Sequence, residues 1–217
     1  MKKGIWWIQA GLAVVLTLFI IGVSVVGTLA FRPLYYRDIE ELQIEERSGY
    51  SKEEIRRNYD VLIDYNMAWE DEPLVLPTIP MSENGRIHFA EVKDIFDGFK
   101  YLAVFCGILG FLGVWYMWRK KAYLYLKMTA VVACGLPAVL GILAIACWQQ
   151  LFTAFHKLFF DNNYWIFSVR KDPVILILPE AFFLHCALLI FGGVLFGAAG
   201  CLIAYFVLRK RAERGIV

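Results

Sequence analysis

The sequence predicts an all-α membrane protein, a four-transmembrane-helix bundle with a small extracellular cap between spans 1 and 2. Its 217 residues are 59% hydrophobic and only 19% charged, and the charges are segregated along the chain. A soluble domain of this size carries charged residues over its whole surface, so the composition excludes that class. Spanning a bilayer takes roughly 20 apolar residues. The stretches of about this length are Ile5–Ala30, Tyr101–Trp118, Met128–Gln149 and Phe182–Leu208.

The apolar stretches divide the chain into spans and connecting segments. The first apolar run is longer than the roughly 7–15 residues of a signal-peptide core, so we interpret it as an uncleaved anchor. We expect transmembrane helices at residues 1–30, 99–118, 128–150 and 182–208. The connecting segments are an acidic cap at 31–98, a cytoplasmic loop at 119–127, an extracellular aromatic loop at 151–181 and a cytoplasmic tail at 209–217.

The charge distribution predicts the orientation. Residues 31–98 carry 16 acidic side chains against 8 Lys or Arg, a net charge of −8. Basic residues gather instead at the other end of the spans, and short basic segments stay in the cytoplasm. Both termini are therefore predicted to be cytoplasmic, with the acidic cap outside. The basic residues are Lys2, Lys3, Arg119, Lys120, Lys121, Lys127, Arg209, Lys210, Arg211 and Arg214.

The cap is predicted to contain helical structure. Ser51 and Glu54 have the spacing of a capping box, which opens a helix to about Asn66. The proline-rich stretch 73–80 is expected to be extended along the membrane surface, and a second helix is expected to begin near His88 and run into the second span. About 68 residues are too few for a generous independent core, so we expect the cap to rest on the ends of the spans.

Two of the three histidines occupy equivalent positions relative to the predicted spans. His88 lies just before the second span and His156 just after the third, both on the outer side. They are therefore expected to meet in one layer, at the interface of cap and membrane. His185 lies about one turn into the fourth span, where a satisfied polar group and a functional group both stay open as interpretations.

Aromatic and acidic residues near His156 are candidates for holding a substrate. Phe152 and Phe159 share its face if this segment is helical, and Trp165 follows in the loop. Asp172 and Glu180 return charge to the start of the last span, where they either orient an imidazole, hold a headgroup or simply mark the interface. The candidate substrate-binding residues are Phe152, Phe159, Trp165, Asp172 and Glu180.

The sequence lacks a recognisable nucleophile motif. It contains no Gly-x-Ser-x-Gly elbow, no Walker loop and no His-Glu-x-x-His pair. Its five cysteines all lie inside apolar runs. If the chain performs acyl chemistry, direct transfer in which histidines handle the protons fits best.

Two stretches of the sequence resemble a known family. The run Phe155–Asn162, followed by Trp165, Asp172-Pro173, Pro179-Glu180 and Phe182-Phe183, resembles the lipoprotein intramolecular transacylase (Lit) family of Gram-positive bacteria. The stretch His88–Asp94 resembles the family's other marked segment. The four-span layout with an outer cap extends this resemblance over the whole chain.

The resemblance implies a reaction and its residues. A diacylglyceryl lipoprotein transfers its own sn-2 acyl chain onto its N-terminal cysteine amine, which gives the lyso-form lipoprotein. The family's motifs assign catalysis to His88 and His156. Of these we choose His156 as the base and His88 as the acid. We expect no metal and no cofactor, a monomer in contact with membrane phospholipid, and no nucleic acid partner.

Two other functions remain open from the sequence. A metal hydrolase would use His88, His156 and His185 as ligands beside Glu91 or Asp94, although no tight ligand spacing supports it. A non-enzymatic membrane sensor or assembly protein would dock its partner through the acidic cap. Loss of activity with chelators identifies the first, and indifference to both outer histidines identifies the second.

Overall fold

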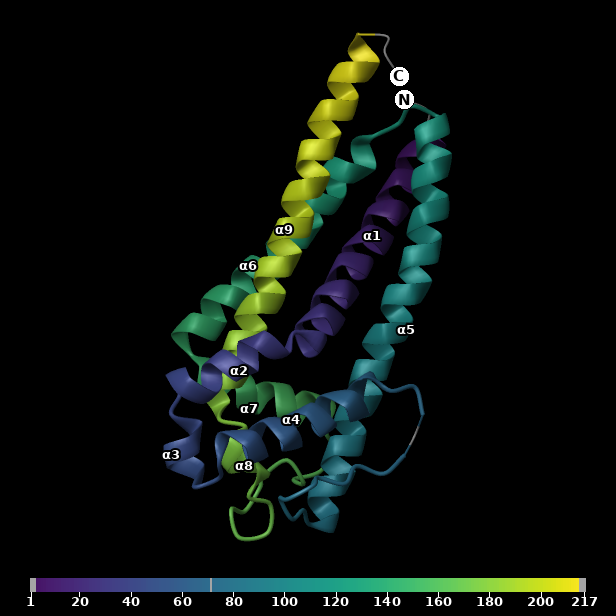
Figure 1. Cartoon of the computed structure of the whole chain (residues 1–217). Helices are drawn as coiled ribbons and strands as arrows, with labels where there is room; N and C mark the ends of the chain where they lie inside the picture. The colour runs from purple at the N-terminus through teal and green to yellow at the C-terminus, as the bar shows by residue number, and fades with distance from the viewer. Residues whose placement is uncertain (1–2, 71, 215–217) are drawn as a thin grey trace. The chain divides into compact units, whose positions relative to one another are not determined.

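The computed structural model describes residues 3–70 and 72–214, and within these ranges the chain is helical with no strand (Figure 1). The helices are α1 Lys3–Ala30, α2 Arg32–Glu41, α3 Ile44–Ser48, α4 Lys52–Met67, α5 Glu83–Arg119, α6 Leu124–Ala146, α7 Trp148–Phe159, α8 Val174–Ile177 and α9 Glu180–Glu213.

Four of these helices are long and apolar enough to cross a membrane, which confirms the predicted fold class. They are α1, α5, α6 and α9. At 1.5 Å per residue, the 37 residues of α5 extend about 55 Å, whereas the hydrocarbon core is about 30 Å thick. Residues 83–98 of α5 contain six charged side chains, so this part precedes the membrane-spanning segment.

The chain divides into two compact units. The first, which we call the span unit, comprises Met1–Val25, Phe99–Ile142 and Leu189–Val217. The second, which we call the cap unit, comprises Val26–Gly98 and Leu143–Leu188. The cap unit thus includes more than the segment between the first two spans, because the chain that follows the third span belongs to the same unit.

Glycines let helices pack closely in the span unit. A Cβ on Gly22 of α1 would lie 3.2 Å from Ala103 Cβ on α5, and one on Gly113 of α5 would lie 2.5 Å from a Leu12 methyl. A Cβ on Gly197 of α9 would lie 2.7 Å from an Ile20 methyl on α1. Small residues of this kind provide close contact where lipid removes the hydrophobic drive for association.

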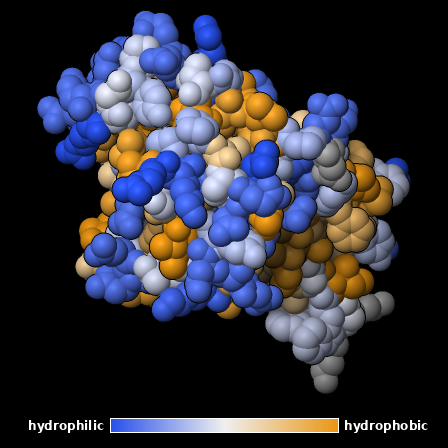
Figure 2. Space-filling model, turned by 90° about the horizontal axis from the view of Figure 1, so that it is seen from below, coloured by the Kyte–Doolittle hydropathy of each residue, from blue (hydrophilic) through white to orange (hydrophobic). Residues whose placement is uncertain are grey.

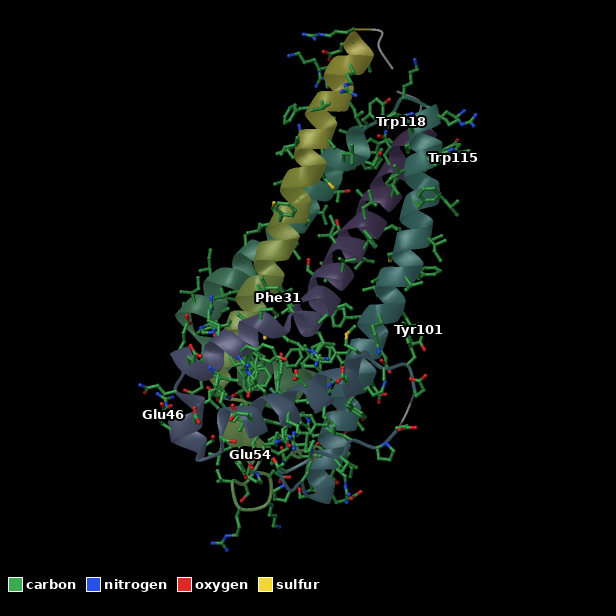
Figure 3. All side chains as sticks on the ribbon, in the orientation of Figure 1. Phe31, Glu46, Glu54, Tyr101, Trp115 and Trp118 are labelled. Carbon is green, nitrogen blue, oxygen red and sulfur yellow. The ribbon has the colours of Figure 1, made fainter. Side chains whose placement is uncertain are left out.

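Aromatic side chains mark the outer surface of α5. Tyr101 and Trp115 project away from the neighbouring helices (Figure 3) and are 63% and 55% exposed. Trp118 is 47% exposed and packs edge-on against Tyr123, with ring centroids 6.1 Å apart. The Arg119 guanidinium lies 5.0 Å from the Trp115 ring centroid, a cation–π distance. This arrangement suits a helix surface that faces lipid and ends at the headgroups.

The cap unit has its own hydrophobic core. Tyr35 of α2 stacks on Tyr59 of α4 with ring centroids 3.7 Å apart, and its hydroxyl donates to the Ile177 carbonyl at 2.6 Å. Burial raises the pKa of both tyrosines. The buried core residues are Leu29, Tyr35, Ile39, Ile44, Ile55, Tyr59, Leu62, Ile63, Leu74, Leu76, Ile79, Phe89, Val174, Ile177, Leu178 and Phe182.

The capping box of α4 is confirmed. Ser51 accepts from the Glu54 backbone N–H, and the Glu54 carboxylate accepts from the Ser51 N–H at 3.0 Å.

Residues 73–80 have neither helix nor strand, as their prolines predicted. On the face shown in Figure 2, seen from below Figure 1, hydrophilic side chains predominate, with hydrophobic patches among them.

Some helix boundaries differ from those expected from the sequence. α5 begins at Glu83, five residues before His88. α6 ends at Ala146, because Cys147 has non-helical angles of φ −149° and ψ 53°, and a separate amphipathic helix, α7, follows. The aromatic segment 151–181 therefore starts as a helix that holds its side chains in fixed positions.

Candidate functional site

His88 lies in the charged N-terminal part of α5, facing the interior of the cap unit. Its side chain is buried, with 5% of the residue exposed. The ring is surrounded by other aromatic rings, at centroid distances of 4.7 Å to Phe160 and 5.5 Å to Phe167. The loop after α7 supplies both phenylalanines, so the loop covers an imidazole that comes from a different helix.

His156 lies in the last turn of α7. This helix is amphipathic: Phe155 and Leu158 are 44% and 78% exposed, whereas His156 is 9% exposed. Its Nδ1 lies 2.8 Å from the Phe152 carbonyl oxygen. Because a carbonyl oxygen only accepts hydrogen bonds, Nδ1 carries the hydrogen and Nε2 keeps its lone pair. The backbone of α7 thus fixes the tautomer in which Nε2 is free to accept a proton.

The two histidines meet, as their positions in the sequence suggested. Their ring centroids are 5.9 Å apart at an interplanar angle of 32°. Trp165 lies against His156 with ring centroids 4.7 Å apart and the rings tilted by 33°, and the Phe152 ring lies 4.3 Å from it at 48°. Phe160 contacts both imidazoles, at 4.7 and 5.6 Å. The result is a pair of imidazoles enclosed by aromatic rings.

Asn162 connects the surroundings of the two histidines. Its Nδ2 donates to Glu91 Oε1 at 2.6 Å, and its Oδ1 accepts from the Tyr164 N–H at 2.9 Å. Its carbonyl accepts from Trp165 Nε1 at 3.2 Å. The second oxygen of Glu91, Oε2, lies 3.9 Å from His88 Nδ1. Asn162 therefore holds the carboxylate beside His88 through its side-chain amide and the indole beside His156 through its main-chain carbonyl.

Asp172 anchors the beginning of α5. Its Oδ1 accepts from the Ser82 N–H at 2.7 Å, and its Oδ2 accepts from the Ser82 hydroxyl at 2.9 Å. A carboxylate at a helix N-terminus satisfies free N–H groups and interacts favourably with the helix dipole. Gly85 fits closely over it, because a Cβ there would lie 2.5 Å from Asp172 Oδ1. Ser82, which Asp172 holds in this way, lies six residues before His88.

Burial keeps both imidazoles neutral. Loss of hydration and, to a smaller extent, the neighbouring His156 together lower the pKa of His88 to about 4. Burial also lowers the pKa of His156, although its bond to the Phe152 carbonyl and the Glu180 carboxylate act in the opposite direction. Near neutral pH the site therefore contains two uncharged imidazoles, each able to accept a proton.

The remaining residues predicted to bind substrate have different surroundings. Phe159 packs on Phe155 at 4.6 Å and is 51% exposed, because three residues along a helix turn its side chain about 60° away from His156. Asp172 is 4% exposed, with both oxygens bonded to Ser82. Glu180 is exposed at the start of α9, and its carbonyl accepts from Trp148 Nε1 at 3.1 Å. Substrate contact by any of them stays a prediction.

His185 occupies a different environment within the cap unit. Its Nδ1 lies 2.7 Å from Oδ2 of Asp38, whose side chain is fully buried. Among the described residues, no three His, Cys, Asp or Glu side chains gather closely enough to hold a metal ion.

Several contributors to the site were not predicted from the sequence. Phe160, Phe167 and Asn162 lie in or just before an irregular loop, where no periodicity indicates which side chains turn inward. Helical spacing could have placed Glu91 beside His88, because a residue three positions later on a helix lies on the same face. The contact of Asp172 with Ser82 joins residues 90 positions apart, which sequence spacing does not reveal.

Comparisons with known proteins give a consistent result. Residues 10–183 match the family described as lipoprotein intramolecular transacylase Lit. The membrane-integral lipoprotein intramolecular transacylase Lit from Bacillus cereus is 35% identical and superposes with a TM-score of 0.95, over 99% of this chain and 100% of that one. A structure of that protein with a histidine substitution matches with 34% identity and a TM-score of 0.88, over 96% and 93% of the chains. Among curated proteins, no match was found.

Proposed function

The chain belongs to the lipoprotein intramolecular transacylase family, and from this premise we propose that it moves the sn-2 acyl chain of a diacylglyceryl lipoprotein onto that lipoprotein's own N-terminal cysteine amine. The product is the lyso-form lipoprotein, an isomer of the substrate with an N-acyl and a monoacylglyceryl group. The observation that carries this proposal is the enclosed pair His88 and His156, with ring centroids 5.9 Å apart.

His156 is the base in this mechanism. Its Nδ1 is committed to the Phe152 carbonyl, so Nε2 is the atom that takes a proton from the attacking amine. The lowered pKa of His156 keeps this nitrogen unprotonated at neutral pH. An α-amine has an ordinary pKa of about 7.7–8.0, so transfer of its proton to an imidazole is modestly uphill.

His88 is the acid. As the amine nitrogen bonds to the ester carbon, the bond from that carbon to the sn-2 oxygen breaks. The proton that His156 takes from the nitrogen passes to His88, and His88 delivers it to this oxygen, which leaves as an alcohol while both imidazoles return to their neutral form. The nitrogen loses one proton and the oxygen gains one, so the reaction is balanced without water. General acid–base assistance of this kind contributes about 10²–10⁴-fold.

The aromatic rings have two tasks. Amine and ester are joined through the cysteine sulfur and the glycerol, so attack closes a medium-sized ring, and holding the two ends together can contribute about 7–11 kcal/mol. Trp165, Phe152 and Phe160 lie where they would hold such a folded substrate. With His88 and His156 only 5% and 9% exposed, little water is available to hydrolyse the ester instead.

A direct test uses a synthetic diacylated lipopeptide and tandem mass spectrometry of its N-terminal fragment. We expect isomerisation at unchanged mass by the wild type, with and without EDTA, and loss of activity in His88→Ala and His156→Ala. His185→Ala is the matched control, because it removes an imidazole from the same unit. Sensitivity to EDTA would favour a metal hydrolase. A folded wild type that leaves the lipopeptide unchanged would favour a docking protein.

We also propose the orientation expected from the charges. Both termini lie in the cytoplasm, the site lies at the extracellular interface of cap and membrane, and the protein acts as a monomer among phospholipids. Fusion of a periplasm-active or a cytoplasm-active reporter to the C-terminus tests the orientation. Activity of the exported reporter alone would contradict it.

A further inference from the structure

A half-buried carboxylate, that of Glu91, faces His88, and its oxygen Oε2 is shielded from solvent without a hydrogen-bond partner in the described chain. Glu91 Oε2 and His88 Nδ1 are 3.9 Å apart, and within the described chain neither atom has a hydrogen-bond partner. Buried polar atoms are normally paired, and an unpaired one costs about 1–3 kcal/mol. Two unpaired atoms that face each other, a carboxylate oxygen and an imidazole nitrogen, form an incomplete acid–base pair.

The other half of this carboxylate is held firmly. Asn162 Nδ2 donates to Glu91 Oε1 at 2.6 Å, and the orientation of the amide follows from its second bond. The Tyr164 N–H is a donor, so the atom 2.9 Å from it must be the Asn162 oxygen. Glu91 is therefore fixed from the loop side, and its free oxygen is aimed at the imidazole three residues earlier on the same helix.

From this geometry we propose that Glu91, held by Asn162, is the positioning residue that enables His88 to carry a proton during catalysis. This inference rests on the acyl transfer proposed above. A shift of about 1 Å brings the 3.9 Å contact into the range of an N–H···O bond. Nδ1 then carries a hydrogen toward Glu91, and the Nε2 proton of the imidazolium is available to the departing sn-2 oxygen.

The surroundings of His88 explain why it needs such a partner. Burial and His156 both oppose the charged form of this imidazole. The titratable groups that face it are Glu91 on its own helix and His156 on α7, whereas the loop supplies the rings of Phe160 and Phe167. An opposite charge within about 4–6 Å favours the charged form. Glu91 is in a position to provide that charge.

The first test is the pH profile of kcat/KM on the diacylated lipopeptide. Glu91→Gln keeps the shape but removes the charge, and its NH₂ group offers Nδ1 a donor instead of an acceptor. We expect an activity loss of about 10- to 100-fold near neutrality and a displacement of the alkaline limb toward acid by at least about one pH unit. Asp94→Asn, an exposed change of equal charge on the same helix, should leave the profile unchanged.

Asn162→Ala provides a second variant in case Glu91→Gln does not fold. It keeps the carboxylate but releases it, so the limb should move in the same direction by a smaller amount. A uniform fall in rate with an unmoved profile in both variants would mean that Glu91 only supports the loop, and the proposal would be overturned.

A binding readout separates this proposal from the reaction itself. A diether lipopeptide, which has no ester to transfer, is bound to protein with ¹⁵N-labelled histidine, and the His88 ring is titrated by NMR. We expect the imidazolium to persist to higher pH in the wild type than in Glu91→Gln, by at least about one unit. Equal titrations overturn the role of Glu91 whether or not the ester substrate reacts. An inactive wild type that retains the difference contradicts only the proposed reaction.

Discussion

The surroundings of His88 and His185, both in the cap unit, are built in opposite ways. His185 has an acidic partner at hydrogen-bond distance, 2.7 Å from the fully buried Asp38. His88 is 3.9 Å from its nearest acid, lies among phenylalanine rings and forms no hydrogen bond through Nδ1 within the described chain. A satisfied histidine stabilises the fold, whereas an unsatisfied one reduces stability and retains its capacity for proton transfer.

This difference favours His88 over His185 as part of the proposed site more clearly than burial or rarity does. Both histidines are inside the unit, and both are intramembrane or interfacial by sequence, which makes each a functional candidate. Their surroundings separate them: His185 Nδ1 has a carboxylate partner, whereas His88 Nδ1 has no hydrogen-bond partner within the described chain. Departures from local rules of this kind concentrate where a protein performs chemistry. The following predictions compare the two sites directly.

The largest effect is expected on activity at the enclosed pair. His88→Ala and His156→Ala should each lower kcat/KM by about 10²–10⁴-fold, and the double variant should be little worse than either single one, because acid and base act as a unit. His185→Ala should stay within about tenfold of the wild type per folded molecule. Mass-spectrometric rates on the diacylated lipopeptide measure all four. Additive losses at His88 and His156 would show that the two act independently.

The next largest effect is expected on stability at the paired site. Asp38→Ala leaves His185 without its partner and removes a fully buried side chain, so we expect unfolding to become easier by about 1–3 kcal/mol. The estimate is below that for a fully buried ion pair because the His185 side chain is 28% exposed. Thermal unfolding in detergent measures it. His88→Ala is the comparison variant and should unfold within about 1 kcal/mol of the wild type; a larger loss there than at Asp38 would reverse the interpretation.

A smaller effect separates the sites by pH. Folded His88 has its pKa lowered from 6.5 to about 4, so between these values the unfolded chain binds a proton that the folded chain does not. The part of the free energy of unfolding that depends on neutral His88 is therefore fully present above about pH 6.5 and decreases as the pH falls toward 4. His88→Gln should remove up to about 2 kcal/mol of this dependence. Unfolding temperatures between pH 4 and 7 measure it, and parallel curves for wild type and variant would contradict the assignment.

The sequence predicted the pair and part of its surroundings, since Phe152 and Trp165 both lie against His156. Histidine is rare in this chain, and the positions of His88 and His156 relative to two apolar spans were enough to bring them together. Helical periodicity also gave α4 and the inward position of Phe152. The loop after α7 has no period, so the choice of Phe160 and Phe167 rather than Phe159 depends on how the loop packs. Residues 143–188 share a compact unit with residues 26–98, a grouping that depends on tertiary contacts.

The smallest predicted effect concerns the anchor of α5, which the sequence suggested only as a charge near the last span. Asp172→Asn keeps one acceptor for Ser82 but loses the carboxylate at the helix N-terminus, which should lower stability by about 1 kcal/mol. Because the anchored turn leads to His88, kcat should fall by severalfold while KM changes little. Gly85→Ala should have the same signature, since its new methyl would meet the same carboxylate at 2.5 Å. If either variant raised KM with kcat intact, Asp172 would contact the substrate directly, and the turn would be part of the binding surface.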